Sequence, residues 1–170
     1  FGSSEEVIEA YARTACTVAS GAELNTANRV GSGELRFVRG GILGPDGAYA
    51  TAAEWGRRCV VRAEFEAARP VCDPFFACGL DNVFGARVTT GSSNWVACPR
   101  RERLAGSGFV DFVFDPLYVM PGEYLATLSS MTPDGRYIDR IVEAFRFEVH
   151  RRQPAGAVAP LNANSGQCLL

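Results

Sequence analysis

The stretch from Met120 to Val149 constrains the fold more than any other part of the sequence. It contains two runs in which apolar and polar side chains alternate, and alternation of this kind places successive side chains on opposite faces of a β-strand. Pro133-Asp134-Gly135, between the runs, predicts a turn, because proline presets φ, aspartate bonds its own backbone and glycine tolerates a positive φ. Two late strands of this kind indicate the closing pair of an antiparallel sandwich.

The alternation assigns a face to each side chain of the two runs. In the first run, the side chains expected to face the core are Tyr124, Ala126 and Leu128. Those expected on the opposite face are Leu125, Thr127 and Ser129. In the second run, Phe145, Phe147 and Val149 are expected inward, and Ala144, Arg146 and Glu148 outward.

Earlier parts of the chain predict further strands, separated by turn signals. The expected strands cover residues 34–41, 57–67, 75–81, 83–90 and 107–115. With no long internal helix, this pattern predicts an all-β fold, an immunoglobulin-like antiparallel β-sandwich over residues 33–150. The expected core consists of Phe37, Val61, Phe65, Phe76, Leu80, Phe112, Phe114, Tyr124, Leu128, Phe145 and Phe147.

The two ends of the chain have a different character. Ser3-Ser4-Glu5-Glu6 is typical of a helix N-terminus, and we expect a short N-terminal helix that ends near Thr14. The small and polar residues that follow predict a linker, so residues 1–32 are interpreted as helix and linker from a preceding domain. Residues 151–170, rich in Ala, Pro, Gly and Asn, predict a flexible tail.

Composition excludes several classes of protein. A net charge of −2 and a pI near 5.5 argue against a nucleic-acid-binding surface. No apolar run approaches the roughly 20 residues of a membrane span, and no secretion signal precedes the first strand. Without secretion, the six cysteines are expected to be free thiols, with Cys59 and Cys78 buried on apolar strand faces.

Catalytic and metal-binding patterns are missing from the sequence. There is no phosphate-binding G-x-x-x-x-G-K-[ST] loop and no G-x-S-x-G elbow, and His150 is the only histidine. Without a C-x-x-C pair, the cysteines do not cluster as zinc ligands. Asp111 and Asp115 could imitate glycosidase carboxylates, but alternation places them on a solvated strand face. We therefore expect no catalytic residue, no metal site and no cofactor.

A binding surface remains the strongest functional prediction. Small and hydrogen-bonding side chains gather on the expected outward face of neighbouring strands, where they leave room for a ligand and match sugar hydroxyl groups. A tryptophan on the adjoining loop could offer its apolar face to a sugar ring or fold back over the core. The predicted carbohydrate-binding residues are Asp81, Arg87, Thr89, Trp95, Thr127, Ser129 and Arg146. The opposite face, with Arg62, Glu64 and Asp111, is the expected control surface.

The order of several segments resembles one known family, the C-terminal domain of the ATP-binding subunit of O-antigen polysaccharide exporters, called the Wzt family. The segments, in chain order, are EEVIEAY, GSGELRF, RRCVVRAEFEA, PFFACGLDNVFG, PGEY and AFRFEV. The resemblance extends over nearly the whole chain to Val149, although each motif is short. It transfers no site residue individually.

The resemblance also implies which molecules the domain binds. It implies an immunoglobulin-like sandwich that forms a homodimer, binds O-antigen polysaccharide at the cytoplasmic side of the inner membrane, and meets the exporter's transmembrane subunit through the parent protein. An unpaired edge on residues 143–150 is the expected dimer contact, because open strand edges invite pairing. Two alternatives stay open: a purely structural dimerisation module of the ATPase subunit, and an accessory domain of a glycan-modifying enzyme.

Overall fold

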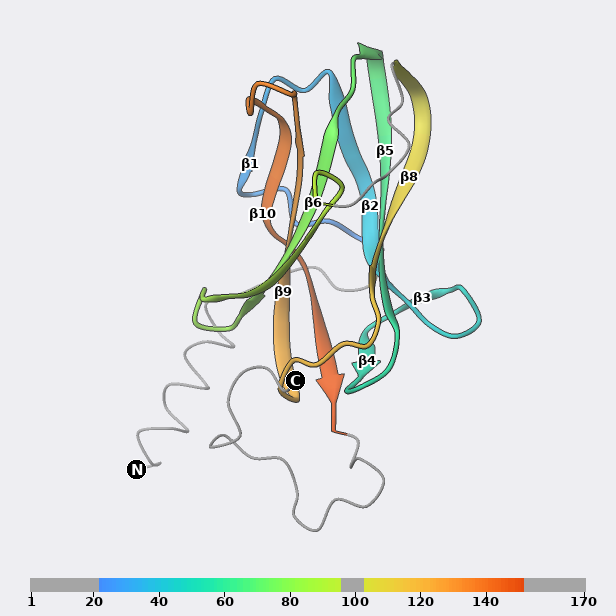
Figure 1. Cartoon of the computed structure of the whole chain (residues 1–170), viewed down its shortest axis with the longest axis vertical. Helices are drawn as coiled ribbons and strands as arrows, with labels where there is room; N and C mark the ends of the chain where they lie inside the picture. Colours follow the sequence, from blue (N-terminus) through green and yellow to red (C-terminus); the bar gives the residue numbers. More distant parts are fainter. Residues whose placement is uncertain (1–21, 96–102, 152–170) are drawn as a thin grey trace.

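The computed structural model describes residues 22–95 and 103–151, and these residues form two β-sheets packed face to face (Figure 1). The described residues contain ten strands and no helix. They also contain no helix that is long and apolar enough to cross a membrane. The all-β sandwich predicted from alternation is therefore confirmed, whereas the expected N-terminal helix lies outside the described residues.

The larger sheet has six strands and is built around the closing pair predicted from the sequence. Five strands run in the order β1-β10-β9-β6-β7, and β4 pairs with β10. Every pairing in the sheet is antiparallel except the parallel one between β4 and β10. The bounds are β1 Arg29–Val30, β4 Ala52–Glu54, β6 Phe75–Asn82, β7 Arg87–Ser92, β9 Gly122–Met131 and β10 Tyr137–His150.

The smaller sheet has four strands in the order β3-β2-β5-β8, all antiparallel. Its strands are β2 Leu35–Leu43, β3 Tyr49–Ala50, β5 Cys59–Val71 and β8 Leu104–Phe114. β5 lies between β2 and β8, and its side chains alternate between a buried face and the face opposite, as the sequence predicts. Arg62, Glu64 and Asp111 lie on the outward face, as expected.

The core lies between the two sheets and contains the predicted side chains. Ten of the eleven predicted residues are buried, and Phe114 is half-buried against the others. Aromatic rings connect the sheets, since Phe65 of β5 stacks on Phe76 of β6 with 5.4 Å between ring centroids. Trp55 is also buried and packs against Tyr118, so it closes one end of the core. Burial of aromatic side chains at about 25 cal/mol per Å² makes this layer the main source of stability.

Three described cysteines have free thiols. Cys59 and Cys78 are buried, as predicted, and Cys72 is exposed. Burial raises the pKa of the Cys59 thiol to about 12, because the thiolate is poorly solvated in the core. The other cysteines, at positions 16, 98 and 168, lie outside the described residues.

Part of the expected linker belongs to the sandwich. Residues 29–30 form β1, which pairs with β10, and the side chain of Leu24 packs against the core. Gly31 passes so close to β10 that a Cβ there would lie 2.4 Å from the carbonyl oxygen of Ile138, so only glycine fits. A strand of two residues has no alternation that a sequence pattern could reveal.

The end of β10 differs from its prediction in two respects. Ala144, expected outward, is buried, because the register shifts between Ile141 and Phe145 at a bulge where Glu143 has φ 56°. The edge expected to be open along residues 143–150 is covered in part. β4 pairs with residues 148–150, and the Asn25 amide donates to the Ala144 carbonyl at 2.7 Å.

Candidate functional site

The predicted binding face lies on the outer side of the six-stranded sheet, where β6, β7 and β9 are neighbours. Gly79 of β6 pairs with Thr127 of β9 on one side and with Thr90 of β7 on the other. Cross-strand partners share a face of the sheet, so these three positions form one row of small side chains. In the neighbouring rows, Ala77 pairs with Ser129 and Asp81 pairs with Arg87.

An ion pair organises this face. The Arg87 guanidinium donates two hydrogen bonds to the Asp81 carboxylate, one of them at 3.1 Å. A third donor of the same guanidinium reaches the Thr90 hydroxyl at 3.2 Å. The Thr127 hydroxyl donates at 2.9 Å to Asp81 Oδ2, the oxygen that also accepts the 3.1 Å bond from Arg87. These hydrogen bonds fix the Arg87 guanidinium over the sheet. They also supply the Asp81 carboxylate with donors from the protein itself.

Three of the predicted residues are less accessible than alternation suggested. Asp81, Thr127 and Ser129 are buried, although all three point to the outer side. Their side chains are short, and the Arg87 side chain lies across Gly79, where an added Cβ would come within 1.9 Å of the guanidinium. The expectation that these side chains are free to meet solvent is therefore wrong. Asp81, Thr127 and Ser129 therefore form a buried polar floor beneath the Arg87 side chain on this face.

Thr89 lies on the other side of the sheet from the face predicted for it. It pairs with Leu80, a core residue, while Arg87 pairs with Asp81, so two steps along β7 match one step along β6. Val88 is the extra residue of this β-bulge, which inverts the alternation of the residues that follow. The hydroxyl that joins Arg87 on the outer face is that of Thr90, which the pattern missed.

The remaining two predicted residues lie at the borders of the face. Trp95 follows the end of β7, in a turn closed by its amide and the Ser92 carbonyl, and its exposed fraction is 69%. It does not fold back over the core. Arg146 of β10 points outward and contacts the Glu123 carboxylate at 3.4 Å. The predicted site thus comes together as a buried polar floor with Arg87, Trp95 and Arg146 around it.

The outer face of the four-stranded sheet is also charged and partly aromatic. Arg62 of β5 makes a bidentate pair with Asp111 of β8, at 2.7 and 2.8 Å, and its guanidinium lies 4.1 Å from the centre of the Phe109 ring. Phe109 is exposed. Glu64 accepts a hydrogen bond from the Tyr49 hydroxyl at 2.8 Å. Burial, followed by this hydrogen bond, raises the pKa of the Tyr49 phenol.

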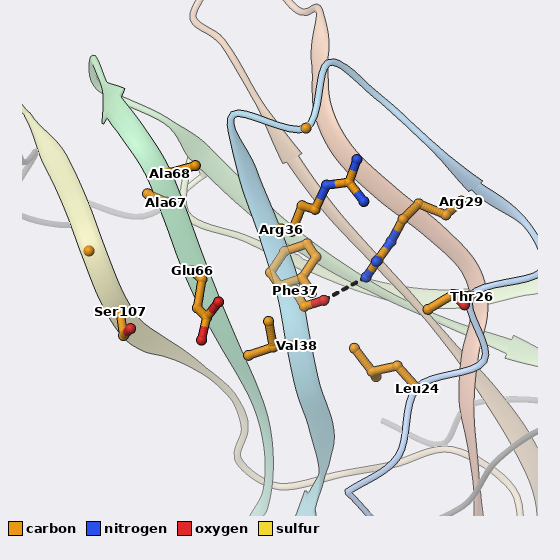
Figure 2. A pocket seen from close by; sticks show the side chains of 12 residues that line it. Leu24, Thr26, Arg29, Arg36, Phe37, Val38, Glu66, Ala67, Ala68 and Ser107 are labelled. Carbon is orange, nitrogen blue, oxygen red and sulfur yellow. Dashed lines mark hydrogen bonds between the residues drawn. The ribbon is translucent and has the colours of Figure 1, made fainter.

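A hollow of about 750 Å³ lies at one end of this face. Figure 2 shows it between the N-terminal segment and strands β2, β5 and β8, with Glu66 and Ser107 on adjacent strands. Its lining includes Leu24, Thr26, Arg36, Val38, Glu66 and Ser107. The sequence pattern could not reveal the hollow, because the N-terminal segment that borders it was expected to be a linker.

One border of the hollow is held by a buried carboxylate. Asp139 of β10 accepts a hydrogen bond from the Phe37 amide at 2.8 Å and lies 3.3 Å from Arg29. Arg29 also donates to the Phe37 carbonyl (Figure 2). Burial raises the pKa of Asp139, and the Phe37 amide and the two nearby arginines, Arg29 and Arg36, oppose that rise. These contacts tie β10 of one sheet to β2 of the other.

The chemistry available on these surfaces is recognition by hydrogen bonds, ion pairs and apolar contact. Within residues 22–95 and 103–151, no three His, Cys, Asp or Glu side chains gather as metal ligands. Asp111, one of the two aspartates considered above as possible glycosidase carboxylates, forms an ion pair with Arg62. Polar side chains on a rigid sheet beside an exposed aromatic ring are typical of a binding surface.

Comparison with known proteins supports a relationship over most of the chain. The model of a family described as the Wzt C-terminal domain matches residues 26–160. A solved structure, titled as the crystal structure of the C-terminal domain of wzt, is similar with a TM-score of 0.67 and 12% sequence identity. The similarity covers 79% of this chain and 83% of that one. No curated protein sequence matches this chain.

Proposed function

Because the chain belongs to the Wzt C-terminal domain family, we propose that it is a non-catalytic carbohydrate-binding domain that recognises O-antigen polysaccharide for export by an ABC transporter. Its parent protein would carry the ATPase domain, and the chain would work at the cytoplasmic side of the inner membrane. It would meet the transmembrane subunit through that parent. The family match over residues 26–160 is the observation that carries this proposal.

Strand connectivity supports an immunoglobulin-like arrangement. In a sandwich of that type, the first, second and fifth strands lie in one sheet, and the third, sixth and seventh lie in the other. The order β2-β5-β8 and the order β6-β9-β10 fit this scheme, with β7 as the additional strand beside β6. Such sandwiches present rigid sheet faces and the loops at their ends for recognition.

The polar face of the six-stranded sheet is the proposed polysaccharide surface. Asp81, Thr127 and Ser129 would hold its floor, and Arg87 would use the exposed part of its guanidinium toward sugar oxygens. Thr90 takes the role first assigned to Thr89. Trp95 would cover the C–H face of a sugar ring, and Arg146 would border the bound chain.

Substitution of Trp95 tests this placement. Since its side chain is exposed, Trp95→Ala should leave the melting temperature nearly unchanged. Its loss should weaken binding of the source organism's polysaccharide about tenfold, as expected for about 1.4 kcal/mol of aromatic contact. Arg62→Ala and Asp111→Ala, on the opposite sheet, are the controls. If the controls abolish binding and Trp95→Ala does not, the polysaccharide binds the other sheet.

A dimerisation role is the second candidate, and an unpaired edge favours it. Among the described residues, β8 pairs with β5 on one side only, and β7 pairs only with β6. Open edges of this kind can pair with a second copy. We propose a homodimer joined at such an edge, with light scattering expected to give twice the 18.3 kDa chain mass. A dimer that binds no polysaccharide would favour the purely structural role.

A further inference from the structure

The hollow on the four-stranded sheet is large enough to hold a small ligand. Its volume of about 750 Å³ lies within the range of roughly 300–1,000 Å³ typical of small-molecule pockets. It is separate from the polar face proposed above, because none of its lining residues comes from β6, β7 or β9. Its walls come from β2, β5, β8 and the segment before β1, which Figure 2 shows together.

Three polar side chains in the hollow have donors or acceptors that no side chain or backbone group of the described residues uses. Arg36, Glu66 and Ser107 are exposed, and cross-strand register places all three in one row. Within the described part of the chain, none of their side chains makes a hydrogen bond or an ion pair. Arginine offers only donors, carboxylate only acceptors, and a hydroxyl group offers both. By contrast, the charged groups of Asp81 and Arg87 on the other sheet form an ion pair with each other.

Apolar side chains lie beside this polar row. Val38 is 42% exposed on the same outward face as Arg36, and a register irregularity between Phe37 and Arg39 leaves it without a cross-strand partner on β5. Leu24 is half-buried at the border toward β1. A sugar ring has hydroxyl groups at its rim and C–H groups on its faces, so it needs directed hydrogen-bonding groups beside an apolar contact. The hollow offers this combination.

Charge selects the kind of sugar. Arg29 is paired with Asp139, and the positive charge of Arg36 is matched by the negative charge of Glu66 on the neighbouring strand. The hollow therefore has no net charge, which favours an uncharged ligand over an anionic or cationic one. Arg36 can donate two parallel hydrogen bonds and Glu66 can accept two, which fits hydroxyl groups on adjacent ring carbons.

We propose that this hollow is a second saccharide-binding site, which takes an uncharged pyranose unit with vicinal hydroxyl groups. The inference rests on the proposed function in one respect, since the natural source of such a unit would be the same polysaccharide. Two sites on opposite sheets of one domain would let a long glycan, or two glycans, be held at once. Multiple weak contacts of this kind raise overall affinity without any single strong one.

Titration of the full chain with simple sugars tests the proposal. The probes are the methyl glycosides of mannose, galactose, glucose and rhamnose, followed by amide chemical shifts in NMR spectra. We expect at least one probe to shift the amides of Val38, Ala68 and Ser107 with a dissociation constant in the millimolar range. Galacturonic acid should bind more weakly than galactose, because the hollow carries no net charge.

Variants on exposed positions locate the binding. Ser107→Trp should fill the hollow and abolish these shifts, and Glu66→Gln should weaken binding about tenfold. Glu64→Gln, two residues away on the same strand and outside the hollow, is the matched control and should have no effect. The proposal is overturned if no glycoside shifts these amides, if the shifts persist in Ser107→Trp, or if galacturonic acid binds best. If the polysaccharide binds and Ser107→Trp leaves its affinity unchanged, the second site fails while the proposed function stands.

Discussion

Removal of Arg87 should destabilise the sandwich, because its guanidinium neutralises a buried carboxylate. Asp81 is 7% exposed and is held by Arg87 and by the Thr127 hydroxyl. Breaking a fully buried pair costs about 3–5 kcal/mol, and an exposed pair contributes about 0–1 kcal/mol. The Arg87 side chain is 43% exposed, so we expect Arg87→Ala to cost about 2 kcal/mol. For a chain of this length that corresponds to a fall in melting temperature of roughly 4–8 °C.

A double-mutant cycle separates the ion pair from other effects of the substitution. Asp81→Asn keeps the shape of the side chain and removes its charge, so it should recover about 1 kcal/mol when combined with Arg87→Ala. Arg57→Ala is the control, since Arg57 and Glu54 form a solvated pair 4.0 Å apart, and it should cost less than about 0.5 kcal/mol. Urea unfolding followed by circular dichroism measures each value. An Arg87→Ala cost no larger than that of the control would refute the structural role of the pair.

Three further outcomes follow from burial. Phe112→Ala should cost about 3–5 kcal/mol in urea unfolding, and an unchanged stability would mean that the faces of β8 are reversed. Because burial raises the pKa of Asp139, the folded state keeps its proton at a pH where the unfolded state has released it. Stability should therefore fall as pH rises above about 4, and Asp139→Asn should lessen that fall. Thiol labelling mapped by mass spectrometry should modify Cys72 in the native protein, and Cys59 and Cys78 only after unfolding; rapid native labelling of either buried thiol would contradict the core.

The strands that could be predicted from the sequence are those with a fully buried face. In β5, apolar side chains recur at every second position from Cys59 to Ala67, because that side of the strand packs on the core. The short strands β1, β3 and β4 have two or three residues each, too few for a period to appear. Their positions depend on pairing with longer strands. β3 pairs with the nearby β2, whereas β1 and β4 pair with β10, which is far away in the sequence.

The sequence could predict the sheet face that most of the candidate residues share, but not their contacts. Alternation placed Asp81 and Thr127 on one outer face, but it could not show that the long side chain of Arg87 lies over that face and satisfies Asp81. β-Bulges account for the errors at Thr89 and Ala144, because one extra residue in a strand inverts the faces of its neighbours. A sequence pattern of period two contains no signal for such an insertion.

Polysaccharide binding by the chain is the claim on which the functional account depends, and calorimetric titration measures it most directly. The ligand is polysaccharide purified from the source organism, and a polysaccharide of unrelated composition serves as the control. We expect saturable binding with a dissociation constant of about 1 mM to 1 μM, which corresponds to roughly −4 to −8 kcal/mol, and no saturation with the control. A chain that is folded and dimeric yet shows no saturable binding of its own polysaccharide would contradict the account.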